Sequence, residues 1–292
     1  MLRGVYTAII TPFNQDGSVD FKAFRKLVEY NIKGGVAGIV VCGTTGESPT
    51  LSHKEKEKLV KVAIKKAKKR VAIIAGTGSN NTSESIEASK KAQELGADAV
   101  MLVNPYYNKP TQEGLYRHFK AVADAITIPV IIYNIKGRTA VNVETPTLMR
   151  VAAECKNVVA VKEASGDLNQ MKDVIAKRPQ GFSVLSGDDN LTLELIKSGG
   201  DGIISVVSNL VPEMVVAMVK SALDGNFADA DRLNTDLIPI YKTAFIETNP
   251  IPIKAACAMK GLCSEVYRLP MCELRPENRD KLQQVLNESE VL

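Results

Sequence analysis

The residue of this chain best suited to covalent chemistry is a lysine that directly follows an apolar run. Val158, Val159, Ala160 and Val161 precede Lys162. A short run rich in β-branched residues is typical of a strand that is buried on both faces of a parallel sheet. An amine held against apolar walls favours its neutral form, and a neutral amine attacks carbonyl carbons to form Schiff bases. The alternative interpretation is that Lys162 is merely the first solvated residue of a loop.

A second apolar run, at 130–133, ends in Tyr133, and Arg138 follows five residues later. A phenol at a strand end can pass protons as a general acid and base, unless it is a core tyrosine with a satisfied hydroxyl. Arg138 can grip a carboxylate at two points, or it can form a surface ion pair. Lys136 also follows this run, so the residues alone do not decide which lysine is the nucleophile. We favour Lys162, because it follows its strand directly whereas Lys136 lies along a glycine-containing loop.

The turn Gly43-Thr44-Thr45-Gly46 suits an anion. Its glycines allow close approach of the backbone, and its N–H groups and hydroxyls can hold a carboxylate. An ordinary helix-capping turn is the alternative.

Other catalytic classes find little support. The two histidines, His53 and His118, fall in helical stretches, which disfavours a histidine-based hydrolase and a histidine-ligated metal site. The sequence contains no HExxH and no phosphate-binding loop motif. Carboxylates that follow the apolar runs lie on separate turns, so a glycosidase pair is unsupported. What remains is lysine, hydroxyls and small loops.

The elements that must position these residues are short apolar runs that alternate with longer amphipathic stretches. Strands are expected at 6–10, 37–42, 71–75, 99–103, 130–133, 158–161, 183–185 and 202–207. Tandem strand–helix units imply parallel strands, and eight of them close into an α/β fold of the (β/α)8 TIM-barrel type. The candidate residues then share the C-terminal end of the barrel, where such folds place their sites. An open doubly wound sheet is the alternative, but Gly76-Thr77-Gly78 lacks the third glycine of the dinucleotide fingerprint.

Helical periodicity continues beyond the eighth expected strand, with no further strong strand. This is more helix than one unit needs. We therefore expect residues 1–223 to form the barrel with its catalytic site, and residues 224–292 to form a C-terminal helical extension.

Composition narrows the partners and the compartment. The 292 residues are 45% hydrophobic with a net charge of +4, and no tryptophan is present. Basic residues gather in the helical stretch 54–70 among interleaved glutamates, which indicates a solvated helix face and no nucleic-acid partner. Five cysteines with no CxxC pair predict neither a disulfide framework nor a zinc site. Since no signal peptide or membrane-spanning run is evident, we expect a cytoplasmic protein without a membrane partner.

Taken together, these motifs resemble the dihydrodipicolinate synthase / N-acetylneuraminate lyase family of class I aldolases. The shared marks are the segments 7–12, 43–47, 133–139 and 161–164, and the resemblance spans essentially the whole chain. The run 104–108 and Arg138 make the chain more similar to the synthases than to the neuraminate lyases.

The resemblance implies the condensation of pyruvate with L-aspartate 4-semialdehyde to 4-hydroxy-tetrahydrodipicolinate, the first committed step towards diaminopimelate and lysine. Lys162 would form the Schiff base with pyruvate, and Tyr133 would donate and accept protons. Thr44 and Tyr107 would complete a hydroxyl relay, with Tyr107 reaching into a neighbouring subunit. No metal and no organic cofactor is implied.

The same resemblance assigns substrate binding and assembly. Thr45 and the backbone of Ile204 would hold the pyruvate carboxylate, and Arg138 would hold the carboxylate of the semialdehyde. A homotetramer, built as a dimer of dimers, is expected. An L-lysine effector site is expected at a subunit interface, from the residues Ser48, His53, Asn80, Glu84 and Tyr106.

Two other functions remain open from the sequence. A sister aldolase would pair pyruvate with another acceptor, in the manner of N-acetylneuraminate lyase or a 2-keto-3-deoxy sugar acid aldolase. A non-catalytic barrel would bind a small acid without forming a covalent bond. Lys136 bears on the first, because many relatives have proline there and a second cation beside Arg138 could change the preferred acceptor.

Overall fold

A closed barrel of eight parallel strands forms the centre of the computed structural model, which describes residues 2–292. Each strand pairs with its neighbours in sequence, and β8 closes the barrel against β1. The strands are β1 (Gly4–Ala8), β2 (Gly38–Val41), β3 (Ala72–Gly76), β4 (Ala99–Val103), β5 (Val130–Asn134), β6 (Val158–Glu163), β7 (Ser183–Ser186) and β8 (Gly202–Ser205). The (β/α)8 TIM barrel expected from the sequence is confirmed.

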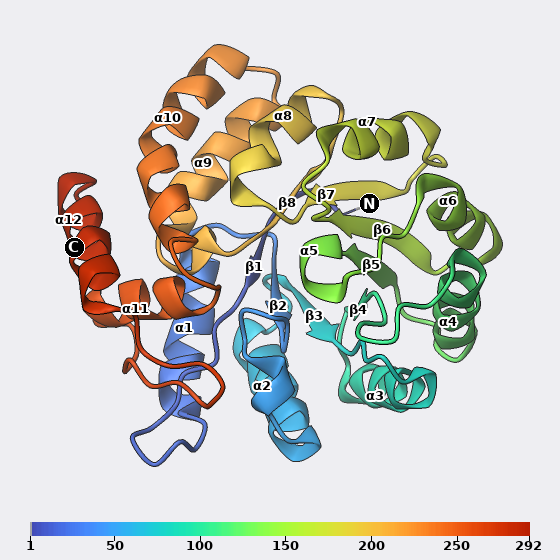
Figure 1. Cartoon of the computed structure of the whole chain (residues 1–292), viewed down its shortest axis with the longest axis horizontal. Helices are drawn as coiled ribbons and strands as arrows, with labels where there is room; N and C mark the ends of the chain where they lie inside the picture. Colours follow the sequence, from blue (N-terminus) through green and yellow to red (C-terminus); the bar gives the residue numbers. More distant parts are fainter. Residues whose placement is uncertain (1) are drawn as a thin grey trace.

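Helices surround the barrel on its outside (Figure 1). Those that connect the strands are α1 (Phe21–Lys33), α2 (His53–Ala67), α3 (Thr82–Leu95), α4 (Gln112–Asp124), α5 (Lys136–Thr139), α6 (Thr145–Glu154), α7 (Leu168–Lys177) and α8 (Thr192–Lys197). α9 (Pro212–Leu223) follows β8 and packs against β1. His53 and His118 lie in α2 and α4, as the sequence indicated.

Local sequence signals explain the ends of several helices. Ser52 caps α2 in a capping box, in which its backbone N–H donates to Glu55 Oε2 at 2.8 Å and Glu55 N–H donates to Ser52 Oγ at 3.3 Å. Gly96 ends α3 with a φ of +88°, a conformation that favours glycine.

Side chains alternate between two cores along every strand. The outward set, which includes Val100, Ile132 and Val161, packs against the helices. The inward set, which includes Ile131, Ala160 and Ile204, fills the barrel interior. Because successive residues of a strand point to opposite faces, Tyr133 and Lys162 point inward, in phase with the interior set, and the residues after them point outward.

The segment after β5 differs from the loop expected there. Residues Lys136–Thr139 form α5, a single helical turn. Thr139 Oγ1 donates to the carbonyl of Ile135 at 2.8 Å and closes the turn. A turn of four residues is too short for helical periodicity to reveal, which is why the sequence did not indicate it.

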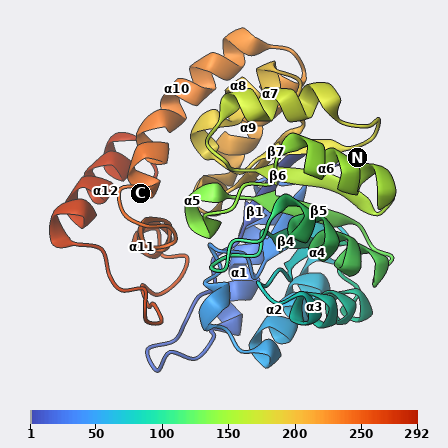
Figure 2. The same cartoon turned by 45° about the vertical axis from the view of Figure 1, so that its right-hand side comes forward.

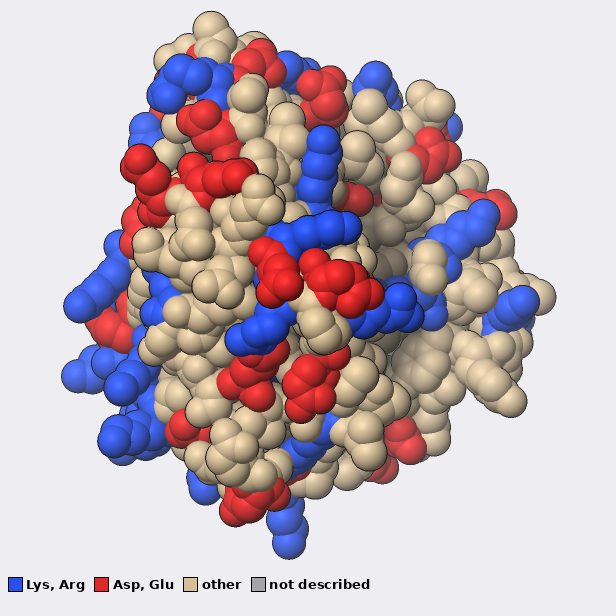
Figure 3. Space-filling model, turned by 60° about the vertical axis from the view of Figure 1, so that its left-hand side comes forward, with Lys and Arg blue, Asp and Glu red and all other residues tan. Residues whose placement is uncertain are grey.

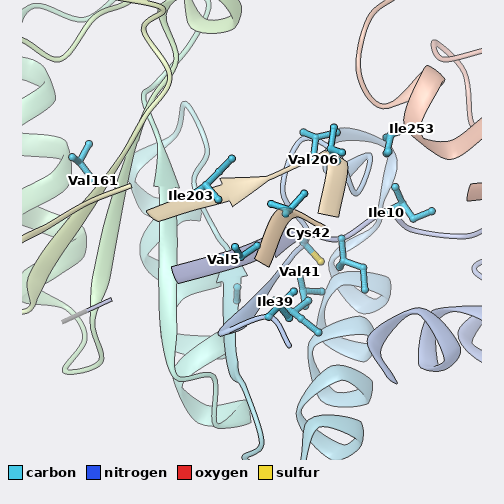
Figure 4. Close-up of a cluster of buried hydrophobic side chains, with 14 of the residues drawn as sticks. Val5, Ile10, Ile39, Val41, Cys42, Val161, Ile203, Val206 and Ile253 are labelled. Atoms are coloured by element: carbon cyan, nitrogen blue, oxygen red, sulfur yellow. The ribbon is translucent and has the colours of Figure 1, made fainter. Parts of the chain in front are cut away.

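The helices after α9 lie together on one side of the barrel (Figure 2). They are α10 (Phe227–Ala244), α11 (Ile251–Met259) and α12 (Pro276–Glu288). Leu237, Ile253 and Leu282 belong to the same hydrophobic core as the outward faces of the strands. Figure 4 shows Ile253 of α11 near Ile10 and Val206 at the barrel end. A C-terminal helical extension is therefore present, and its division from the barrel at 223/224 stays a prediction, since the two parts share one core.

Candidate active site

Two neighbouring strands bring Lys162 and Tyr133 together inside the barrel. The register of β5 and β6 pairs Tyr133 with Lys162. Lys162 Nζ lies 4.2 Å from the centroid of the Tyr133 ring, and each residue is only 4% exposed. An amine beside a phenol and largely withdrawn from water is suited to nucleophilic attack on a carbonyl with proton transfer close by. The alternative interpretation of Lys162, a solvated loop residue, is wrong.

The turn after β7 leaves room for the lysine side chain. A Cβ added to Gly187 would lie 3.0 Å from Lys162 Cε, 3.1 Å from Lys162 Cγ and 2.6 Å from the Cβ of Ala164. The contact with Ala164 is closer than real Cβ atoms allow, and the two contacts with Lys162 are tighter than most real Cβ contacts. Glycine at position 187 therefore leaves room for Ala164 and for the side chain of Lys162, and a larger residue would force a shift of this turn.

A cavity of about 460 Å³ opens at this end of the barrel. Tyr133 lines it together with Thr44 and Arg138. The volume is in the range that accommodates small organic ligands. Hydroxyl and guanidinium groups therefore converge on one cavity beside the buried amine.

A residue of the C-terminal extension connects Thr45 and Arg138. Asn249 Nδ2 donates to Thr45 Oγ1 at 3.0 Å, and Arg138 Nη2 donates to the carbonyl oxygen of Asn249 at 3.1 Å. Thr45 is buried, whereas Arg138 is exposed at the cavity. The extension thus holds two of the expected substrate-binding residues in relation to each other.

A buried ion pair lies next to the same turn and was not expected from the sequence. Glu47 accepts from Lys254 of α11, and both side chains are fully buried. Lys254 Nζ also donates to the carbonyl of Val266 at 3.0 Å, and it lies 4.3 Å from the centroid of the Phe13 ring. Burial lowers the pKa of the Lys254 amine, and the neighbouring Glu47 carboxylate opposes that shift. The pair fastens the end of the Gly43–Glu47 turn to α11.

Four expected site residues are not among those that line this cavity within the chain: Lys162, Thr45, Tyr107 and Ile204. Tyr107 is 88% exposed and adopts a φ of 78°. It is not among the residues that line the cavity with Tyr133 and Thr44. Ile204 is fully buried in the barrel interior, in the same cluster as Tyr133. A single copy of the chain therefore does not assemble the expected relay.

Four of the five expected effector residues line the same cavity. Ser48, His53, Glu84 and Tyr106 line it, and Asn80 Nδ2 donates to the carbonyl of Tyr106 at 3.4 Å. The two groups of residues thus share one continuous cavity in the monomer.

The rival lysine lies outside this arrangement. Lys136 is exposed on α5, whereas Lys162 is buried beside Tyr133, which lines the cavity. Its position favours Lys162 as the nucleophile.

Charged surface side chains and possible metal ligands are two further features that could mark a site in the part of the chain that the structure describes. Figure 3 shows acidic and basic side chains interspersed over one face of the molecule. Among residues 2–292 there is no group of three or more His, Cys, Asp or Glu side chains that could hold a metal ion. No helix within this range is long and apolar enough to cross a bilayer.

The sequence model of the dihydrodipicolinate synthetase family matches residues 1–289 of this chain. The chain belongs to that family. Two relatives that share this membership are the 4-hydroxy-tetrahydrodipicolinate synthases of Endomicrobium trichonymphae and Koribacter versatilis. The first is 50% identical over 288 residues, which cover 99% of this chain and 98% of the relative. The second is 50% identical over 292 residues, which cover 100% and 97%.

Solved structures of other members of the dihydrodipicolinate synthetase family superpose closely. The dihydrodipicolinate synthase from Aquifex aeolicus matches with a TM-score of 0.98 and 46% identity, over 99% of each chain. The enzyme from Acinetobacter baumannii, solved in complex with pyruvate, gives 0.98 and 43%, over 100% of each chain. The enzyme from Cyanidioschyzon merolae, solved with lysine bound, gives 0.97 and 38%, over 99% of each chain. The similarity to this family therefore covers the backbone fold of the whole chain as well as its sequence.

Proposed function

We propose that this chain condenses pyruvate with L-aspartate 4-semialdehyde to 4-hydroxy-tetrahydrodipicolinate, through a Schiff base on Lys162. This reaction is the first committed step towards diaminopimelate and lysine. The observation that carries the proposal is the buried Lys162–Tyr133 pair, with 4.2 Å between the amine and the ring centroid, in a member of this family. The relatives at 50% identity bear the name of that synthase.

The chemistry follows from an amine and a proton-transferring phenol. The Lys162 amine adds to the keto carbon of pyruvate, and loss of water gives an iminium, which is an electron sink. Loss of a methyl proton then gives an enamine, whose carbon attacks the aldehyde and forms the new C–C bond. The amine of the semialdehyde attacks the iminium carbon and releases Lys162. Tyr133 carries the protons, since its side chain lies beside Lys162.

Carboxylate recognition is assigned to Thr45 and Arg138, which are joined through Asn249, and to the backbone of Ile204. Thr45 and the backbone of Ile204 hold the pyruvate carboxylate, and Arg138 holds the carboxylate of the semialdehyde. The position of Arg138 at the cavity and its bond to the Asn249 carbonyl support this role.

The proton relay requires a second copy of the chain. Thr44 and Tyr133 line the cavity, whereas Tyr107 is an aromatic side chain exposed to 88%. We assign Tyr107 to the cavity of a neighbouring subunit, where its hydroxyl joins those of Thr44 and Tyr133. The assembly proposed is a homotetramer built as a dimer of dimers, in the cytoplasm.

Borohydride reduction in the presence of pyruvate tests this function directly. A covalent adduct on Lys162, found by mass analysis, is expected, together with consumption of the semialdehyde. Consumption of a sugar aldehyde in its place would identify a sister aldolase. Absence of any adduct would identify a non-catalytic acid-binding barrel, and an adduct on Lys136 would replace Lys162 as the nucleophile.

We also propose feedback inhibition by L-lysine, which would bind to Ser48, His53, Asn80, Glu84 and Tyr106. The carboxylate of Glu84 and the amide of Asn80 suit the ammonium and carboxylate groups of the effector. We expect millimolar L-lysine to lower the initial rate of the condensation by half or more. The variant Glu84→Ala should keep its rate under the same conditions. A rate of the parent protein that is unchanged by lysine refutes this regulation.

A further inference from the structure

A second pair of residues lies immediately behind Lys162 and Tyr133. The register of β5 and β6 pairs Asn134 with Glu163, one position beyond the Tyr133–Lys162 pair. Because side chains alternate along a strand, this second pair points out of the barrel, towards α6 and α7. Both side chains are fully buried. A buried amide and a buried carboxyl thus support the two strands from the opposite face.

The carboxyl of Glu163 receives only hydrogen-bond donors. Asn134 Nδ2 donates to it at 3.1 and 3.3 Å, Gln170 Nε2 of α7 at 3.2 Å, and the backbone N–H of Ser165 at 2.8 Å. Burial raises the pKa of the Glu163 carboxyl, while these donors oppose the shift. Both oxygens act as acceptors, so this position requires two acceptor atoms.

The orientation of the Asn134 amide is fixed by other partners. Its Oδ1 accepts from Asn104 Nδ2 at 2.8 Å and from the backbone N–H of Val143 at 3.0 Å. Its Nδ2 donates to Asn142 Oδ1 at 2.9 Å. A flipped amide would break all three bonds. Asn134 therefore always presents a donor to Glu163, and the pairing has a single polarity.

The same network reaches the turn that carries Arg138. Asn104 Nδ2 also donates to the carbonyl of Val141 at 3.1 Å, and Thr139 Oγ1 donates to that carbonyl at 2.9 Å. Asn104 directly follows β4, and Thr139 ends α5. The ends of β4, β5 and β6 and the exit of α5 are thus held by one set of buried hydrogen bonds.

We infer that Glu163 and Asn134 are positioning residues, which set the relative placement of Lys162, Tyr133 and Arg138 from outside the barrel. They contact neither the cavity nor the substrate. This inference rests on the proposed function, because it assigns the role through the Schiff-base lysine. Displacement of a catalytic group by about 1 Å can cost roughly 100-fold in rate, and supporting hydrogen bonds are what prevent it.

Glu163→Gln tests the inference with minimal change of shape. The amide nitrogen that it introduces would replace either Oε1, which accepts from Ser165 N–H, or Oε2, which accepts from Gln170 Nε2, so one of these donors would lose its acceptor at position 163. We expect kcat to fall about 10- to 100-fold, with KM for pyruvate changed by less than about threefold, because carboxylate binding at Thr45 is untouched. Gln170→Ala removes one donor to Glu163 at the half-buried side of the network and should lower kcat about two- to fivefold. This variant tests the inference if Glu163→Gln does not fold.

The double variant Asn134→Asp/Glu163→Gln restores complementarity with the polarity reversed. The carboxylate introduced at position 134 can still accept from Asn104 and Val143. The amides of Asn142 and Gln170, which hydrogen-bond to each other, must turn over together so that Asn142 donates to this carboxylate. The amide introduced at position 163 can donate to that carboxylate while its oxygen accepts from Ser165. We expect this variant to recover at least tenfold of the lost kcat. Recovery by polarity reversal would not result from a simple loss of stability.

Asp201→Asn is the matched control. Asp201 is also a buried carboxylate that ties strands together, since it accepts from Val184 N–H at 2.8 Å and pairs with Arg178, but it lies at the opposite end of the barrel. We expect it to lower the melting temperature without changing kcat of the folded protein. Parent kcat in Glu163→Gln, no recovery in the double variant, or an equal kcat loss in Asp201→Asn each overturns the inference. A parent protein that forms no pyruvate adduct instead overturns the proposed function.

Discussion

Replacing Lys162 by alanine is expected to lower kcat by about 10⁴-fold or more and to abolish the covalent adduct with pyruvate. The loss is of this order because removal of a nucleophile that acts as part of a unit eliminates the covalent route as a whole. Tyr133 cannot compensate, since its phenol has no bound intermediate on which to act. The measurements are the steady-state rate of condensation and the mass of the protein after borohydride reduction.

Lys136→Ala is the control for this variant. Lys136 also follows β5, but it is exposed on α5, whereas Lys162 is buried beside Tyr133. We expect it to keep the adduct and to retain kcat within about threefold. If Lys162→Ala keeps the adduct while Lys136→Ala loses it, the assignment of the nucleophile is wrong. If both variants form it, the adduct lies elsewhere and the mechanism fails.

The barrel and the inward placement of Lys162 beside Tyr133 were predictable because their signals are local. Lys162 and Tyr133 each end an apolar run, and the strand alternation that buries such runs also directs the last side chain inward. Eight repeats of the strand–helix pattern then bring the strand ends together without knowledge of any individual contact. The signal for Glu163 and Asn134 was also present. Each is a polar residue one position past an inward-pointing residue, which places it on the buried outer face.

The contacts made by the C-terminal extension were not predictable in this way. Asn249 and Thr45 are 204 residues apart, and Lys254 and Glu47 are 207 residues apart. The helical stretch around Lys254 is predominantly apolar. A single lysine in it gives no periodic pattern from which its ion-pair partner could be predicted. Only the packing of α11 against the barrel determines which carboxylate it meets. The exposed position of Tyr107, outside the cavity of its own chain, is likewise invisible in the sequence pattern.

Lys254→Met is expected to lower the free energy of unfolding by about 3–5 kcal/mol, because it leaves the Glu47 carboxylate buried without its cation. Methionine approximates the length of the lysine stem, so the loss arises from the charge and not from a large cavity. Urea unfolding followed by circular dichroism at neutral pH measures the effect. Lys220→Met is the surface control: Lys220 of α9 pairs with Asp224, both side chains are exposed, and we expect no measurable shift of the unfolding midpoint.

The double variant Glu47→Gln/Lys254→Met separates the charge from the packing. The amide introduced at position 47 leaves no buried ion, and its oxygen can still accept from the backbone N–H of Arg268, which donates to Glu47 Oε2 at 3.3 Å in the parent. Because replacing both partners of a buried ion pair removes the desolvation cost of both charges, the double variant should be more stable than Lys254→Met alone. Equal stability of the two variants would show that Lys254 contributes packing only. Glu47 ends the turn that carries Thr44 and Thr45, so a kcat lowered by Lys254→Met should rise again in the double variant together with the stability. Such a joint recovery would link this distant ion pair to the cavity.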